Sequence, residues 1–264
     1  MSFWSISQID AMKGIKTPHD ADLKDIGDKH IDVLRKVEPS ELENIATKMG
    51  AEIVDMDMGE EWCLRKQYFP GVEVNVLYQY YGDEFGIGEE DELQFLFSGD
   101  KARWVSGEDL THFCEITVTN IELIATDSVF SETYGGEPNQ MLLKGLSERS
   151  EPFFMVDEGQ YKSLADFIGG TLLMSNPEKL FSISKMIFPD FTCIFWGTRD
   201  KKINFQVDGL ALRRIPVYDT QRLVLMILNQ CLRKIKVMMG QDAPRVCNLM
   251  FSGFYKKQNP DLFP

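Results

Sequence analysis

The fold class is decided by the stretch Val72-Glu-Val-Asn-Val-Leu-Tyr78, in which apolar and polar residues alternate. A period of two is typical of a β-strand that buries one face. Short strands are also predicted over 51–54, 61–66 and 93–97, and the connections between them are short. Short connections favour antiparallel pairing, so the middle of the chain is predicted to form an antiparallel sheet.

Helical patterns lie on both sides of this sheet. Thr17 and Pro18 predict the start of a helix, because Thr is a good N-cap and Pro is tolerated at the first helical position. Ser40 and Glu43 predict a second start through a capping box. Near the C-terminus, a helical period predicts a long amphipathic helix over about 219–239.

The remaining strands and the domain organisation follow from the same patterns. Strands are predicted over 115–120, 192–196, 203–207, 210–215 and 246–251, while 126–159 has no readable period and could be a long functional loop. No Gly/Ser-rich linker and no internal repeat is evident. We therefore expect one α+β domain over 1–264, in which a mainly antiparallel sheet is flanked by helices. Within this domain we expect three sub-units: a helical part at 1–50, an antiparallel sheet at 51–125 and a helix-sheet-helix part at 160–264.

The composition is typical of a globular protein of the cytoplasm. The chain has 264 residues, of which 44% are hydrophobic and 26% charged, and these proportions exclude a disordered chain. The sequence begins without the basic and apolar regions of a signal peptide, and no run of about 18 apolar residues could span a membrane. The five cysteines lack a C-x-x-C spacing, so we expect buried, reduced thiols without a structural disulfide.

Charge is unevenly distributed along the chain. Residues 1–198 carry a net charge of −20 and residues 199–264 carry +7, which together give −13. Both signs could simply keep the surface solvated. Alternatively, the two signs face each other across an internal or subunit interface, or the basic end binds an anion.

The strongest candidate for a binding site is the segment Phe195-Trp-Gly-Thr-Arg-Asp-Lys-Lys202, where three cations follow an aromatic pair at a predicted turn. Arginine gives an anion bidentate contacts and lysine gives a mobile charge. An ordinary solvated hairpin tip is the alternative. A sequence pI near 4.8 argues against nucleic acid as a partner. The candidate binding residues are Trp196, Arg199, Lys201, Lys202, Arg213 and Arg214.

Other polar clusters carry less information. The acidic segment 83–92 lacks the alternating ligands of an EF-hand, and it favours a solvated turn over a cation site or a contact with a basic partner. His19, His30 and His112 have no metal-binding spacing and are interpreted as structural. Neither a metal site nor a catalytic residue is assigned, and no cofactor is implied by these patterns.

Short motifs over about 34–236 resemble an uncharacterised prokaryotic domain family of anaerobes. They include Val37-Glu-Pro-Ser-Glu-Leu42, Trp104-Val-Ser-Gly-Glu-Asp-Leu110 and the order Phe195-Trp-Gly, Phe205-Gln-Val-Asp and Ile215-Pro-Val-Tyr-Asp. The resemblance implies the same order of elements and a prokaryotic cytosol. Some members of the family are associated with iron–sulfur or corrinoid proteins, but this chain lacks the clustered cysteines that such an association implies.

Two functional hypotheses follow. The first is a non-catalytic binding or accessory protein that uses its divided charge to contact a protein partner, another copy of itself or a small anion. The second is an enzyme or cofactor-handling protein with an anion site near the Trp196 turn, reached by residues 126–159.

Overall fold

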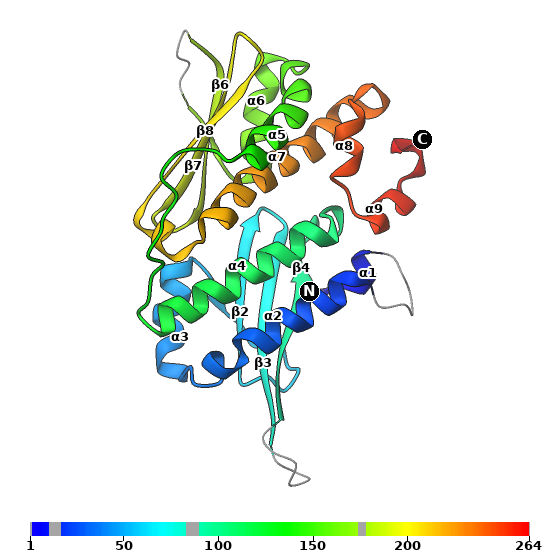
Figure 1. The fold of residues 1–264 in the computed structure, drawn as a ribbon. Helices are drawn as coiled ribbons and strands as arrows, with labels where there is room; N and C mark the ends of the chain where they lie inside the picture. The colour runs from blue at the N-terminus through cyan, green and yellow to red at the C-terminus, as the bar shows by residue number, and fades with distance from the viewer. Residues whose placement is uncertain (1, 11–16, 83–89, 174–177, 264) are drawn as a thin grey trace. The chain divides into compact units, whose positions relative to one another are not determined.

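The computed structural model describes residues 2–10, 17–82, 90–173 and 178–263. The chain, for which the sequence predicts one domain, divides into two compact units, Met1–Val129 (unit 1) and Phe130–Pro264 (unit 2). The division falls inside the stretch without a readable period, where no linker composition marks it. Each unit contains an antiparallel four-stranded sheet accompanied by helices (Figure 1), so the predicted α+β class is confirmed.

Unit 1 places its helices against one sheet. Its helices are α1 (Ile6–Ile9), α2 (Pro18–Leu34), α3 (Pro39–Met49) and α4 (Gly107–Ala125), with the 3-10 helix η1 (Ala102–Trp104). Its strands, in their order across the sheet, are β1 (Glu52–Ile53), β2 (Trp62–Phe69), β3 (Val72–Gly82) and β4 (Glu90–Ser98). Figure 1 shows α2 and α4 lying side by side over β2, β3 and β4.

The core of unit 1 lies between this sheet and its helices. Leu64, Val76 and Phe95 form one cross-strand row, and all three are buried. The Tyr68 ring stacks on Phe113 of α4 with a centroid distance of 4.1 Å, and the Tyr68 hydroxyl donates to the Phe113 carbonyl at 3.1 Å. Aromatic stacking and a satisfied hydroxyl together fix α4 on the sheet.

Unit 2 is built from a second sheet and its own helices. Its helices are α5 (Gln140–Ser150), α6 (Glu158–Ile168), α7 (Val217–Met239), α8 (Arg245–Leu249) and α9 (Gly253–Gln258), with the 3-10 helices η2 (Glu151–Phe154), η3 (Leu210–Arg214), η4 (Gly240–Asp242) and η5 (Pro260–Leu262). Its strands, again in sheet order, are β5 (Thr171–Leu172), β6 (Lys179–Phe188), β7 (Phe191–Thr198) and β8 (Ile203–Asp208).

Aromatic residues fill the core of unit 2. Phe181 of β6 stacks on Tyr161 of α6 at 4.5 Å and on Phe153 of η2 at 5.8 Å. The Arg149 guanidinium donates to Asn229 at 2.7 Å and thereby links α5 to α7. The predicted helix over 219–239 is confirmed as α7, whose apolar face packs in this core.

The two units share one topology, although no repeat is evident in the sequence. Leu64 pairs with Val76 in unit 1, and the pair 119 residues further along, Ile183 and Phe195, has the same place in unit 2. The β-bulge before Phe69 also recurs, before Phe188. For β4 and β8 the offset in residue number is 110, because the β7–β8 hairpin as a whole is shorter: Phe205 follows its partner Phe195 by 10 residues, whereas Phe95 follows its partner Val76 by 19.

Two buried lysines have equivalent places in the two units. Lys66 donates to the carbonyl oxygens of Met49 and Gly50 at 2.7 and 3.2 Å, and Lys185 donates to the carbonyl oxygen of Gly169 at 3.4 Å. Carbonyls at the C-terminal end of a helix lack intrahelical partners, and the helix dipole favours a cation there. Each lysine therefore ties the end of a helix, α3 or α6, to the sheet.

Several predicted elements are wrong. The expected strand 115–120 lies inside α4, so the part of the chain predicted as a sheet, 51–125, ends with a helix. The expected strand 210–215 is instead the 3-10 helix η3, and the expected strand 246–251 is mostly the helix α8. Ser106 caps α4 by accepting from the Asp109 N–H at 3.4 Å. Most sides of α4 are buried, and a helix buried all round shows no clear amphipathic period. The helix start at Thr17 is confirmed, whereas α3 begins after Glu38, not at Ser40.

Candidate functional site

The three cations predicted as a binding group lie in the turn between β7 and β8. Arg199, Lys201 and Lys202, here called the basic turn, are all exposed. Lys201 has a left-handed backbone with φ 59°, which the tight turn requires. The Lys202 ammonium lies 2.7 Å from the Asp200 carboxylate, and this hydrogen bond raises the pKa of Lys202. The turn as a whole retains an excess of positive charge.

Trp196 lies near the basic turn, on the last part of β7. Its ring is partly exposed, and the Lys179 ammonium lies 4.0 Å from the ring centroid. Lys179 pairs across the sheet with Thr198, the last residue of β7. Lys179 thus adds a fourth cation near the turn. The sequence did not indicate this residue, because only the strand register brings it to Trp196.

Arg213 and Arg214 lie at the other end of β8 from the basic turn. They belong to η3, and β8 separates them from the turn by six residues, roughly 20 Å of extended chain. A strand over 210–215 would have run back toward the turn, but the 3-10 helix does not. The Arg213 carbonyl accepts from the Phe130 N–H at 2.8 Å, and burial lowers the pKa of Arg214. The surface around the turn therefore does not include this pair.

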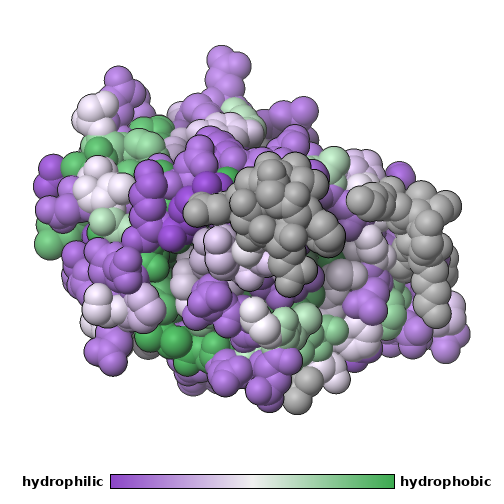
Figure 2. Space-filling model, turned by 90° about the horizontal axis from the view of Figure 1, so that it is seen from below, coloured by the Kyte–Doolittle hydropathy of each residue, from purple (hydrophilic) through white to green (hydrophobic). Residues whose placement is uncertain are grey.

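The two units differ strongly in charge. Unit 1 contains 27 acidic and 11 basic residues, a net charge of −16, whereas unit 2 contains 14 acidic and 17 basic residues, a net charge of +3. Figure 2 shows many hydrophilic side chains, with apolar ones among them, on the face seen from below. The negative charge of the chain is thus concentrated in unit 1.

A groove of about 810 Å³ runs between α2 and β4 in unit 1. The charged side chains that line it are Asp20, Lys24, Asp28, Asp91 and Glu92, and both apolar and uncharged polar residues form the rest of its wall. With four carboxylates and one ammonium, this groove is here called the acidic groove. Its volume is within the usual range of sites that enclose a ligand.

Existing contacts hold the acidic groove in shape. Asp91 accepts from the Arg35 guanidinium at 3.0 Å and from the Tyr78 hydroxyl at 3.2 Å. Burial, with the nearby Asp91 charge, raises the pKa of Tyr78 to about 12. Asp28 and Lys24 form an exposed ion pair at 2.5 Å, and Glu92 accepts a hydrogen bond from the Tyr81 hydroxyl at 3.5 Å. Asp91 is therefore a structural member of the wall, whereas Asp28 and Glu92 present their charge to solvent.

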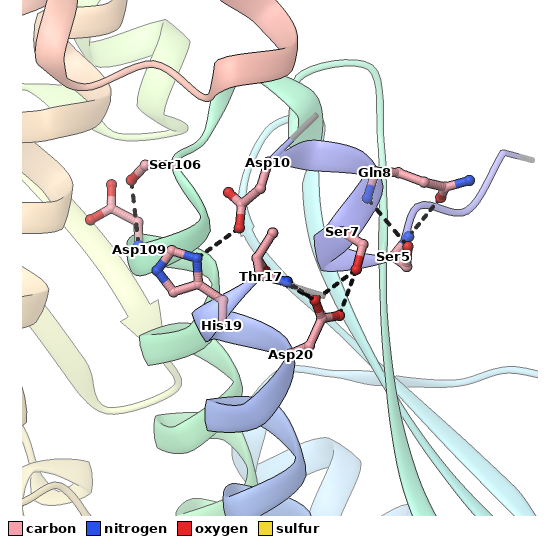
Figure 3. A network of polar contacts seen from close by, with 9 residues as sticks. All are labelled: Ser5, Ser7, Gln8, Asp10, Thr17, His19, Asp20, Ser106 and Asp109. Carbon is pink, nitrogen blue, oxygen red and sulfur yellow. Dashed lines mark hydrogen bonds and ion pairs between the residues drawn. The ribbon is translucent and has the colours of Figure 1, made fainter. Parts of the chain in front are cut away.

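A polar network joins α1 to the start of α2 (Figure 3), and two of its members, Thr17 and Asp20, also line the acidic groove. The Ser7 hydroxyl donates to both carboxylate oxygens of Asp20 at 2.7 Å, and the Thr17 N–H donates to the same carboxylate at 2.6 Å. Beside this network, His19 pairs with Asp10 at 2.7 Å. These contacts anchor the start of α2 against α1.

The other predicted polar clusters are distributed as follows. His30 pairs with Glu122, and His112 lies 3.9 Å from Glu115, so each of these histidines has a carboxylate neighbour. Among the described residues, no group of three or more His, Cys, Asp or Glu side chains could hold a metal ion. Most of the acidic segment 83–92 lies outside the described residues.

The five cysteines are buried and free, as predicted. Burial raises the pKa of Cys63, Cys193 and Cys247 to about 12, and it raises the pKa of Cys114 and Cys231 as well. A thiol acts as a nucleophile in its thiolate form, which these surroundings disfavour.

No family model, curated protein or solved structure matches this chain. The resemblance to a prokaryotic family therefore stays a prediction. In the part of the chain that the structure describes, no helix is long and apolar enough to cross a membrane.

Proposed function

We propose that this chain is a non-catalytic binding protein of the cytoplasm that associates with further copies of itself, with the basic turn as its contact site for an acidic protein surface. The observation that carries the proposal is the exposed cation group of unit 2 on a chain whose unit 1 has a net charge of −16. Five buried thiols with raised pKa values support a reducing compartment and a role other than thiol catalysis.

Electrostatics favours this contact between molecules. Opposite charges steer two proteins together and select their relative orientation, and they act over a Debye length of about 8 Å at physiological salt. Trp196, partly exposed beside Lys179, supplies an aromatic side chain of the kind that anchors interfaces. The basic turn would attract an acidic surface, and Trp196 would supply apolar contact area.

Charge reversal tests the proposal. Lys201→Glu/Lys202→Glu should weaken self-association about tenfold or more at low salt, measured by sedimentation velocity over a concentration series, because each copy then repels the acidic surface. Lys144→Glu/Lys162→Glu is the matched control: it makes the same charge change at exposed lysines of α5 and α6 and should leave association unchanged.

Two results would contradict the proposal. Wild-type protein that remains monomeric at low salt has no association to lose. A monomer whose thermal midpoint rises with millimolar inorganic phosphate, in the wild type but not in the turn variant, would instead identify a small-anion site.

A further inference from the structure

We infer that the acidic groove of unit 1 in a second copy of the chain is the surface that receives the basic turn. The inference rests on the proposed function and names the partner surface. It follows from the charges of the two sites: Arg199, Lys201 and Lys202 at an exposed hairpin tip, and four carboxylates against one ammonium along the groove. The two sites therefore have complementary charge, which steers association and favours a specific contact.

The shape of the groove suits a protruding turn better than a flat surface. Its volume of about 810 Å³ lies between a helix and an edge strand, and the apolar side chains of Leu93, Phe95 and Leu96 help to line it. Gly27 brings α2 close to β4, since a Cβ at this position would lie 3.5 Å from the Leu93 carbonyl oxygen. The helix thus already covers the strand edge there, which favours insertion of side chains over addition of a further strand.

The carboxylates at the rim remain accessible to an incoming cation. Asp28 is 65% exposed, and its partner Lys24 is 71% exposed. An exposed ion pair of this kind is weak, and a second cation can share the carboxylate. Glu92 is also exposed, whereas Asp91 is held by Arg35. Asp28 and Glu92 are therefore the groove residues that should contact the basic turn.

The inference is tested by reversing the charge of both surfaces in the full chain. Asp28→Lys/Glu92→Lys should weaken self-association at low salt about tenfold, the same effect that is expected of Lys201→Glu/Lys202→Glu. A chain with all four substitutions should associate again, because its acidic turn then faces a basic groove and its net charge equals that of the wild type. The control Glu43→Lys/Glu52→Lys changes exposed carboxylates of α3 and β1 and should have no effect.

Thermal midpoints near that of the wild type would show that each variant is folded. If the turn variant loses association but the groove variant keeps it, the proposed function stands and the groove is not the partner surface. If each pair of reversals abolishes association and the four together fail to restore it, the two surfaces do not contact each other. A wild type without salt-sensitive association would overturn both proposals.

Discussion

Lys185 carries a charge in a place that disfavours it. Its side chain is buried, and burial lowers its pKa from 10.5 to about 8. The bond to the Gly169 carbonyl at 3.4 Å compensates for only part of the lost hydration. Between pH 8 and 10.5, the unfolded chain binds more protons at this residue than the folded chain does. Stability therefore rises with pH across this window, by at most about 3 kcal/mol.

Lys185→Met should remove this pH dependence. The measurement is urea unfolding of both proteins at about pH 7, 9 and 10. As the pH rises, the free energy of unfolding of the wild type should increase relative to that of the variant. At the lowest pH, the variant should be at least as stable as the wild type. Lys162→Met, at an exposed lysine, serves as the control and should follow the wild type. An equal pH dependence in Lys185→Met and the wild type would show that Lys185 is not the group responsible.

At the scale of elements, the same glycine turn ends the last strand of each sheet. Gly99 and Gly209 have φ values of 96° and 125°, and a Cβ at these positions would lie 2.3 and 1.7 Å from the carbonyl oxygens of Gly71 and Asp190. Neither contact can be relieved without a backbone shift, because both neighbours are main-chain atoms. The turn at the end of the sheet therefore requires glycine in both units.

Gly99→Ala and Gly209→Ala should each destabilise the protein more than Gly59→Ala does. Gly59 also has a positive φ, of 81°. Apart from its two neighbours in the chain, no described residue has an atom within 4 Å of a Cβ added at this position. Its substitution therefore isolates the backbone strain of about 1–2 kcal/mol. The other two substitutions add a clash with the main chain. Chemical denaturation midpoints of the three variants give the comparison, and equal losses at all three positions would mean that the close approach is unimportant.

At the scale of the molecule, the charge of unit 1 should make stability depend on salt. A net charge of −16 over one compact unit produces self-repulsion in the folded state. Raising NaCl from about 10 to about 150 mM shortens the Debye length from roughly 30 to 8 Å and should raise the thermal midpoint of the monomer. Scanning calorimetry at low protein concentration measures this effect. A midpoint that falls with salt would mean that attractive ion pairs outweigh the repulsion.

The sequence by itself determined the features that depend on local periodicity. The alternation of Val72 to Tyr78 predicted β3, the helical period of 219–239 predicted α7, and Thr17 predicted the start of α2. It also located the basic turn, because turn residues and charge are both readable in one short segment. These features are determined by neighbours along the chain, so no long-range contact was needed to find them.

The tertiary structure alone decided which distant residues share a surface and which units repeat. Register places Lys179 at Trp196, and a 3-10 helix in place of a strand separates Arg213 from the basic turn. At most positions the two units repeat burial and pairing rather than residue identity, as Leu64 and Ile183 illustrate. Identical pairs such as Lys66 and Lys185 are scattered along the chain, so the repeat is not evident from the sequence. The physical reason is that packing selects for apolar volume at a position, and many sequences satisfy the same volume and register.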